Sequence, residues 1–162
     1  MTKRALACCL FVPAIVFAQP SPSPAEPLVR TAQGAFFAVV VPDLQASAAW
    51  YQEKLGLKVV MPLSRHERTA AMALEGGGLI VELIQNDDAE PLATAAPAVK
   101  GELFVHGVFK AGVVVDDFER TVAQLKARGI EIVAGPFPTR PGMRANVLVK
   151  DNNGNLIQFF GK

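Results

Sequence analysis

The sequence predicts an α+β fold built from two copies of one β-α-β-β-β unit, and two observations carry this prediction. The segment Phe36–Leu44 resembles the segment Lys110–Phe118, which lies 74 residues later, and the segment Gly78–Leu83 aligns with Gly154–Phe159 at an offset of 76. A repeat of this length is typical of a supersecondary unit. We expect a first module at residues 35–85 and a second at residues 104–161, joined by a connector rich in alanine and proline.

Each module begins with a short β-branched run, which is typical of a strand. An aspartate follows each run, Asp43 in the first module and Asp117 in the second, and aspartate is favoured at the N-cap of a helix. Apolar residues then recur on one helical face, and each helix ends near a glycine, Gly56 or Gly129, as a C-terminal cap requires. Tyr51 shares the apolar face of the first helix, so we expect it in the core.

Three further strands complete each module. They are predicted at residues 57–60, 70–74 and 78–83 of the first copy and at residues 130–133, 144–149 and 154–159 of the second. A turn joins the last two strands of each copy, and the Asn-Gly pair of the second turn is a strong hairpin signal. With a helix on one side of each sheet, the other sides are expected to form a shared concave surface suited to a small molecule.

The first 18 residues have the layout of a secretory signal peptide: Lys3 and Arg4 precede an apolar run that ends at Ala18. That run is too short for a membrane-spanning helix, which needs about twenty residues. The proline-rich residues 19–33 predict an extended linker, and residues 34–162 the folded domain. We therefore expect an exported protein, periplasmic or secreted, with no membrane span after cleavage of the signal peptide.

Composition excludes several classes of function. The chain is 51% hydrophobic and 19% charged, so most of it folds around a sizeable core. Its formal charge of +1 leaves no electrostatic footprint for nucleic acid. Cleavage of the signal peptide would remove Cys8 and Cys9, and a chain without thiols has no cysteine nucleophile and no thiolate ligand. We also find no catalytic-triad motif, and Gly76–Gly78 lacks the lysine of a phosphate-binding loop.

The repeated segments resemble the vicinal oxygen chelate superfamily, which includes glyoxalase I, bleomycin-resistance proteins and extradiol dioxygenases. The resemblance rests on residues 41–57 and 115–129 and on the ending Lys150–Phe159, and it covers nearly all of the predicted mature chain. It implies paired βαβββ modules that form a cupped mixed sheet. It also implies a divalent metal in the cup of most family enzymes, and modules that pair within or between chains, so that a homodimer is one expectation.

The resemblance further implies four metal-ligand positions, on the first and last strands of each module. In this sequence they are Phe36, Glu82, Lys110 and Gln158. Phenylalanine has no lone pair, a protonated lysine repels a cation, and glutamine offers only a weak carbonyl ligand. A divalent site usually needs at least three protein ligands. We therefore expect a cup without metal or other cofactor, which binds a small organic molecule through these four residues and Arg144.

Three alternatives stay open. Glu82 and Lys110 would form an ion pair if both point into the cup, and that pair is either structural or an anchor for an anion or a carbonyl group. A metal held by Glu82, His106 and Gln158 would instead make the protein a lyase, an isomerase or a dioxygenase of the superfamily. In the third, side chains of the domain fill the cup. The sequence does not decide whether the protein is an enzyme.

Overall fold

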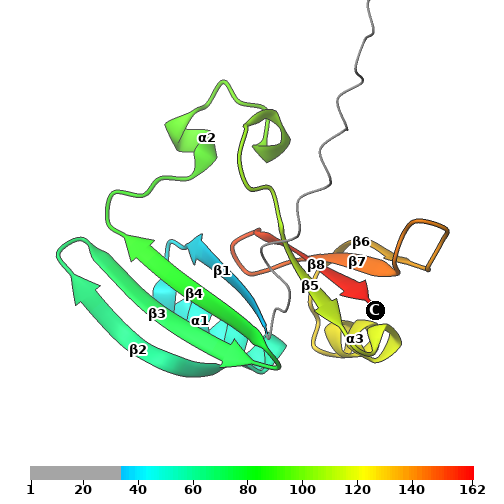
Figure 1. Ribbon diagram of the computed structural model, residues 1–162. Helices are drawn as coiled ribbons and strands as arrows, with labels where there is room; N and C mark the ends of the chain where they lie inside the picture. The colour runs from blue at the N-terminus through cyan, green and yellow to red at the C-terminus, as the bar shows by residue number, and fades with distance from the viewer. Residues whose placement is uncertain (1–33) are drawn as a thin grey trace, which may run out of the picture. The chain divides into compact units, whose positions relative to one another are not determined.

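The structure, a computed structural model, describes residues 34–162 and contains two modules of the same topology (Figure 1). Each module consists of one strand, one main helix and three further strands. The α+β class and the paired βαβββ modules that the sequence predicts are therefore confirmed. The predicted signal peptide, residues 1–18, and the predicted linker, residues 19–33, lie outside the described residues.

The first module forms a four-stranded mixed sheet in the order β1-β4-β3-β2. Strand β1 is parallel to β4, and β3 is antiparallel to both of its neighbours. Helix α1 packs on β3 and β4. The elements are β1 (Ala35–Val40), α1 (Leu44–Trp50), the π-helical turn η1 (Tyr51–Leu55), β2 (Lys58–His66), β3 (Thr69–Gly76) and β4 (Leu79–Asn86).

The second module repeats this arrangement in a separate sheet of order β5-β8-β7-β6, with β5 parallel to β8. Its elements are β5 (Ala111–Val115), α3 (Phe118–Ala127), β6 (Ile132–Phe137), β7 (Asn146–Lys150) and β8 (Leu156–Gly161). The connector between the modules holds two short helical turns, α2 (Leu92–Ala95) and η2 (Glu102–Phe104). Within residues 34–162 no helix has both the length and the apolar character to cross a membrane.

The two main helices begin and end in the same way, as the sequence predicts. Asp43 and Asp117 each accept a hydrogen bond of 2.9 Å from the backbone N–H three residues further on, which makes both of them N-caps. Gly56 has a φ of 73° and Gly129 a φ of 65°. Glycine adopts this left-handed conformation without a Cβ penalty, so it is suited to end a helix there.

The backbone hydrogen bond that closes the first helix spans one residue more than the bond that closes the second. The backbone N–H of Leu57 donates to Tyr51 O, six positions back, whereas Ile130 donates to Leu125 O, five positions back. The π-helical turn η1 accommodates the extra residue. The apolar periodicity predicts a regular helix over this segment, because a single inserted residue at a helix end leaves the apolar face intact.

Strand β2 is longer than the sequence predicts. It continues through Pro62 to His66, and its pairing with β3 shifts register on both sides of Met61. A proline is tolerated there because β2 is an edge strand and bulges remove the need for a ladder N–H. The charged residues around His66 would favour a loop, but His66 is the last residue of β2.

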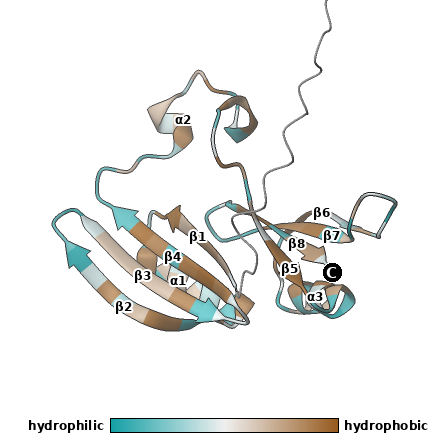
Figure 2. Cartoon of the chain, in the orientation of Figure 1, coloured by the Kyte–Doolittle hydropathy of each residue, from teal (hydrophilic) through white to brown (hydrophobic). Residues whose placement is uncertain are grey.

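One core unites the two modules. Alternate residues of β4, among them Val81 and Leu83, are buried on the side of the sheet that faces α1. They belong to the same buried cluster as Phe118, Val122 and Leu125 of α3. Tyr51 is fully buried in this cluster, as predicted. Figure 2 shows apolar residues along β1, β4 and β5, the strands on which the core and the open faces are built.

Three hydrogen bonds cross between the modules within the described part of the chain. The Tyr51 hydroxyl donates to Asp151 Oδ2 at 2.9 Å, and the Asn153 amide donates to Ser47 Oγ at 2.8 Å. Arg128 Nη1 donates to the carbonyl oxygen of Lys54 at 2.9 Å. Burial, and then the charge and the hydrogen bond of Asp151, raise the pKa of the Tyr51 phenol well above its ordinary value. The phenol is therefore held protonated as a donor to the carboxylate.

Candidate functional site

The side of each sheet that carries no helix remains open. On β1 the side chains alternate, so that Phe36 is 63% exposed and Val40 is 56% exposed. On β5 the residue Val114 is 53% exposed in the same way. Isolated apolar residues are common on protein surfaces, but these lie in rows along strands that border the expected cup. The open faces therefore present apolar surface from both modules.

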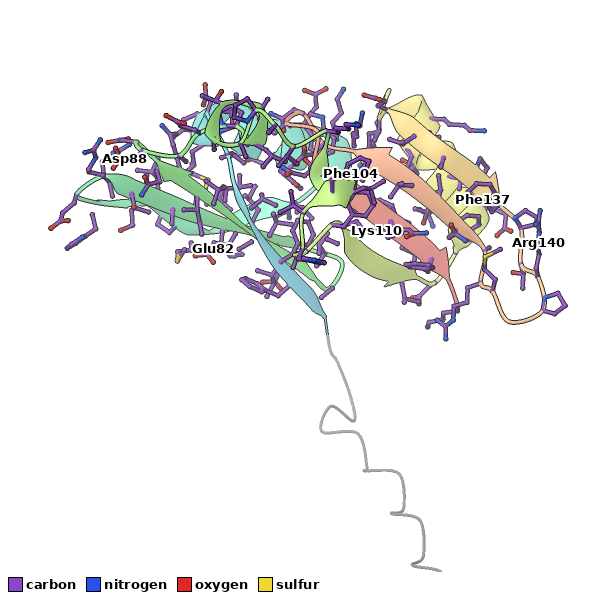
Figure 3. The ribbon with its side chains drawn as sticks, turned by 90° about the horizontal axis from the view of Figure 1, so that it is seen from above. Glu82, Asp88, Phe104, Lys110, Phe137 and Arg140 are labelled. Carbon is purple, nitrogen blue, oxygen red and sulfur yellow. The ribbon has the colours of Figure 1, made fainter. Side chains whose placement is uncertain are left out.

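Phe36 and Glu82 share the open face of the first sheet. Parallel pairing sets Phe36 opposite Ile80 and Ala38 opposite Glu82, so the two predicted site residues lie diagonally on neighbouring strands. Antiparallel pairing sets Ala73 on the other side of Glu82. Because both of these partners are alanine, the Glu82 carboxylate has no polar side chain directly opposite it on β1 or β3. Figure 3 labels Glu82 on the strand β4.

Gln158 and Arg144 are brought together in the second module through Asn146. The Asn146 side-chain amide donates to the Arg144 carbonyl oxygen at 3.0 Å. The side-chain oxygen of Asn146, Oδ1, accepts a hydrogen bond of 2.9 Å from Gln158 Nε2. The Arg144 carbonyl thus fixes the orientation of Asn146, and Asn146 fixes the orientation of Gln158, because a carbonyl only accepts.

This chain of bonds leaves Gln158 Oε1 buried without a hydrogen-bond partner among the described residues. A buried acceptor of this kind costs about 1–3 kcal/mol when it stays unpaired. Its neighbours across the sheet are Gly112, which has no side chain, and Leu148, which is apolar. An N–H or O–H group of a bound molecule would satisfy this acceptor.

Lys110 lies immediately before β5, is exposed, and lines a cavity of about 280 Å³ beside β1. The other wall of this cavity includes Val39 of β1, and Leu156 of β8 lies near the same opening. Within residues 34–162 no ion pair joins Lys110 to Glu82, which belong to different modules (Figure 3). The Glu82–Lys110 pair considered from the sequence therefore does not form in this structure.

The residues at the family's ligand positions do not fit a divalent metal. Phe36 and Lys110 supply no lone pair to a cation, and Glu82 and Gln158 lie on different sheets. His106 lies in the exposed connector before β5. Across the described residues no three side chains of histidine, cysteine, aspartate or glutamate gather as metal ligands would. The described residues at these positions therefore do not suit a divalent cation.

Asn146 is a site residue that sequence reasoning did not identify. It is 5% exposed, and its side chain is what orients Gln158. A signal was present in the sequence, since a single asparagine interrupts the apolar run Ala145–Val149, most of which belongs to strand β7. A buried polar residue in such a run usually has hydrogen-bond partners, and here one of them is a predicted site residue.

Comparisons with solved structures agree on the fold. The structure of SMU.1112c has a TM-score of 0.61 and 18% identity, over 77% of this chain and 95% of that one. A glyoxylase/bleomycin resistance protein/dioxygenase domain from Frankia sp. EAN1pec has a TM-score of 0.59 and 17% identity, over 76% and 87%. TnmS3, described as an antibiotic binding protein from Streptomyces sp. CB03234, has a TM-score of 0.54 and 18% identity, over 84% and 98%.

Sequence comparison assigns the family. No curated protein matches the chain at a significant level. A family model, the Glyoxalase/Bleomycin resistance protein/Dioxygenase superfamily, matches residues 34–159, which include both modules. The chain therefore belongs to the glyoxalase/bleomycin resistance protein/dioxygenase superfamily.

Proposed function

We propose that the protein binds a small organic molecule, without a metal, on the open faces of its two sheets. The observation that carries this proposal is the unpartnered Oε1 of Gln158, held by Asn146 at a position where the family usually has a metal-binding glutamate. An amide oxygen that is buried and fixed in orientation selects a ligand with an N–H or O–H group. The apolar side chains beside it would contact the body of the ligand.

Two further observations support binding rather than metal-dependent catalysis. The ligand positions Phe36 and Lys110 have no lone pair for a cation at neutral pH, so a metal-centred reaction lacks its donors. A fold neighbour, TnmS3, is described as an antibiotic binding protein, and the same architecture would serve binding here. Arg144, whose exposed side chain lies beside the network, is available to an acidic group on the ligand.

The proposed setting is an exported homodimer. Export rests on the signal-peptide pattern of residues 1–18. We propose that a second copy covers the part of the open faces that the small molecule does not contact, because Val40 of the first module and Val114 of the second are exposed there. The connector adds Leu103 and Val108, which are 74% and 96% exposed. Contiguous apolar patches on a protein surface often mark interaction sites.

Native mass spectrometry of the protein purified from its own host tests this function. We expect a small-molecule adduct and no stoichiometric divalent metal. The variant Gln158→Leu removes the acceptor at similar volume and should lose the adduct, whereas the matched variant Gln45→Leu, on the exposed side of α1, should retain it. Stoichiometric zinc, nickel, iron or manganese would contradict the proposal and favour the lyase, isomerase or dioxygenase alternative.

A further inference from the structure

A second cavity lies on the opposite side of the sheets from the open faces, where the two modules meet. It has a volume of about 350 Å³, which is at the lower end of the range of about 300–1,000 Å³ for ligand pockets. Helix α3 forms one wall, and the turn between β3 and β4 forms the other. The floor is apolar and includes the buried side chains of Leu57, Leu79, Leu125 and Phe159.

The repeat places an equivalent junction elsewhere in the molecule, between α1 and the turn that joins β7 to β8. The two helices make equivalent hydrogen bonds in their first turns. Ser47 Oγ donates to the Asp43 carbonyl oxygen at 2.7 Å, and Thr121 Oγ1 donates to the Asp117 carbonyl oxygen at 2.7 Å. Tyr51 and Leu125 correspond because each accepts the bond that closes its helix. This correspondence allows the two junctions to be compared residue by residue.

The junction at α1 is filled by side chains. Tyr51 is fully buried there and donates to Asp151, and Asn153 of the same turn donates to Ser47. Asp151 is itself only 6% exposed. A phenol ring, a carboxylate and an amide thus occupy the space between the helix and the turn of the other module.

The junction at α3 has lost these groups. Leu125 stands at the position of Tyr51, and in the turn Gly77 stands at the position of Asn153. A Cβ added to Gly77 would meet no atom within 4 Å, so nothing replaces the missing asparagine. Glu75, the counterpart of Asp151, is exposed, and among the described residues its carboxylate forms no hydrogen bond with the helix. The cavity is the space that these three replacements leave.

The rim of this cavity carries three cationic and two acidic side chains, a formal charge of +1. Lys54, Arg120 and Arg128 line it. Two aspartates line it too. Asp116 is paired with Lys162 and Lys54 is paired with Glu53, whereas Asp117 keeps its charge as the N-cap of α3. Arg120 has no ion-pair partner among residues 34–162. An apolar floor below an unpaired guanidinium matches a molecule with an apolar body and one negative group.

We propose that the cavity between α3 and the β3–β4 turn is a second binding site, for a small apolar carboxylate. The carboxylate lies at Arg120, and the apolar body lies on Leu57, Leu125 and Phe159. The site is separate from the open faces, so it does not depend on the function proposed above. The missing tyrosine and asparagine explain why the space beside α3 is open. At the other junction a cavity of about 620 Å³ is lined by Asn153 and Asn155, but it lies beside Val41 and Pro42, before the helix, and no residue of α1 lines it.

Titration of isotopically labelled protein with octanoate, followed by NMR, tests this site. We expect saturable shifts of the backbone amides of Gly76, Gly77 and Thr121. Acetate, which has the charge without the apolar body, and octylammonium, which has the body with the opposite charge, should produce no saturable shift at these amides. Shifts confined to the open faces, such as those at the Gln158 side-chain amide, would overturn this inference and leave the function proposed above untouched.

Two pairs of variants on α3 locate the ligand. Gln124→Trp places an indole at the rim of the cavity and should weaken octanoate binding at least tenfold, whereas Ala123→Trp, which is exposed and does not line the cavity, should leave it unchanged. Arg120→Gln should weaken binding about two- to fivefold, as expected for an exposed ion pair. Lys126→Gln changes the net charge equally on the same helix and should have no effect. Equal effects within either pair would also overturn the inference.

Discussion

The two modules share their strand order and their helix caps, but the turn between their last two strands carries different side chains. The turn of the first module, residues 75–78, reads Glu-Gly-Gly-Gly, and that of the second, residues 151–154, reads Asp-Asn-Asn-Gly. In the second turn, Asp151 accepts bonds from the backbone N–H groups of Asn153 and Asn155, from the Asn155 side-chain amide, and from the Tyr51 hydroxyl. The described residues show no such side-chain network in the first turn.

This difference shows that separate residues determine the arrangement of the elements in a module and the packing beside its helix. The caps Asp43 and Asp117 and the alternation of the strands recur in both copies, and they define where each element starts and which face is buried. The turn residues, together with the helix residue that faces them, Tyr51 or Leu125, decide instead whether the space between helix and turn is closed. A few substitutions at these positions are therefore enough to open a cavity without changing the topology.

Replacement of Asp151 should have the largest effect on stability. Asp151→Ala removes a buried carboxylate that four donors share, so we expect a loss of at least about 3 kcal/mol in the free energy of unfolding. The counterpart Glu75→Ala, at an exposed position, should change it by less than about 0.5 kcal/mol. Urea denaturation measures both variants. Similar losses for the two variants would mean that the turns do not differ as described.

The pH dependence of stability should reveal Tyr51, the single tyrosine of the chain. Its pKa is raised in the folded state, so below about pH 10 the phenol is protonated in both states and stability is unaffected. Above pH 10 the unfolded phenol loses its proton while the folded one keeps it. The folded state should therefore lose about 1.4 kcal/mol per pH unit relative to the variant Tyr51→Phe.

Urea denaturation of wild type and Tyr51→Phe between pH 8 and pH 11 measures this difference. The absorbance of the ionised phenol provides an independent readout, since no other tyrosine contributes. The lysines ionise in the same range, but they are common to both proteins and cancel in the comparison. Parallel stability curves for the two proteins would show that Tyr51 is not held in a buried hydrogen bond.

The N-caps should give the smallest effect and the same effect in both modules. Asp43→Ala and Asp117→Ala each remove one bond of 2.9 Å to a backbone N–H, and each should cost about 1 kcal/mol. Thermal unfolding of the two variants, with the exposed substitution Glu119→Ala as a control, compares them. If the two losses of stability differed by more than about 1 kcal/mol, the two N-caps would not be equivalent, although their hydrogen bonds have the same length.

Local patterns predict most of the fold. The β-branched runs, the aspartate caps and the glycine ends act within a few residues of one another, and the structure confirms them. The π-helical turn and the full length of β2 are not predicted, because neither one inserted residue nor a bulge changes the apolar pattern noticeably. The short turns α2 and η2 escape prediction because segments of four and three residues are too short to show an apolar period.

The site is less predictable than the fold. The repeat locates Glu82 and Gln158 at equivalent strand positions, and the structure shows them in the middle of their sheets. The role of Asn146 depends on a cross-strand pairing that is set by the register, and the cavity at α3 depends on what the other module does not supply. Both are relations between distant segments, which no local pattern records.

The seam between the modules has a mechanical consequence. Neither β1 nor β5 has a ladder partner in the other sheet, so no backbone ladder crosses from one module to the other. The modules are tied by the shared core and by the three side-chain hydrogen bonds described above. The position of one sheet relative to the other therefore depends on side-chain packing and on these hydrogen bonds, and not on backbone pairing.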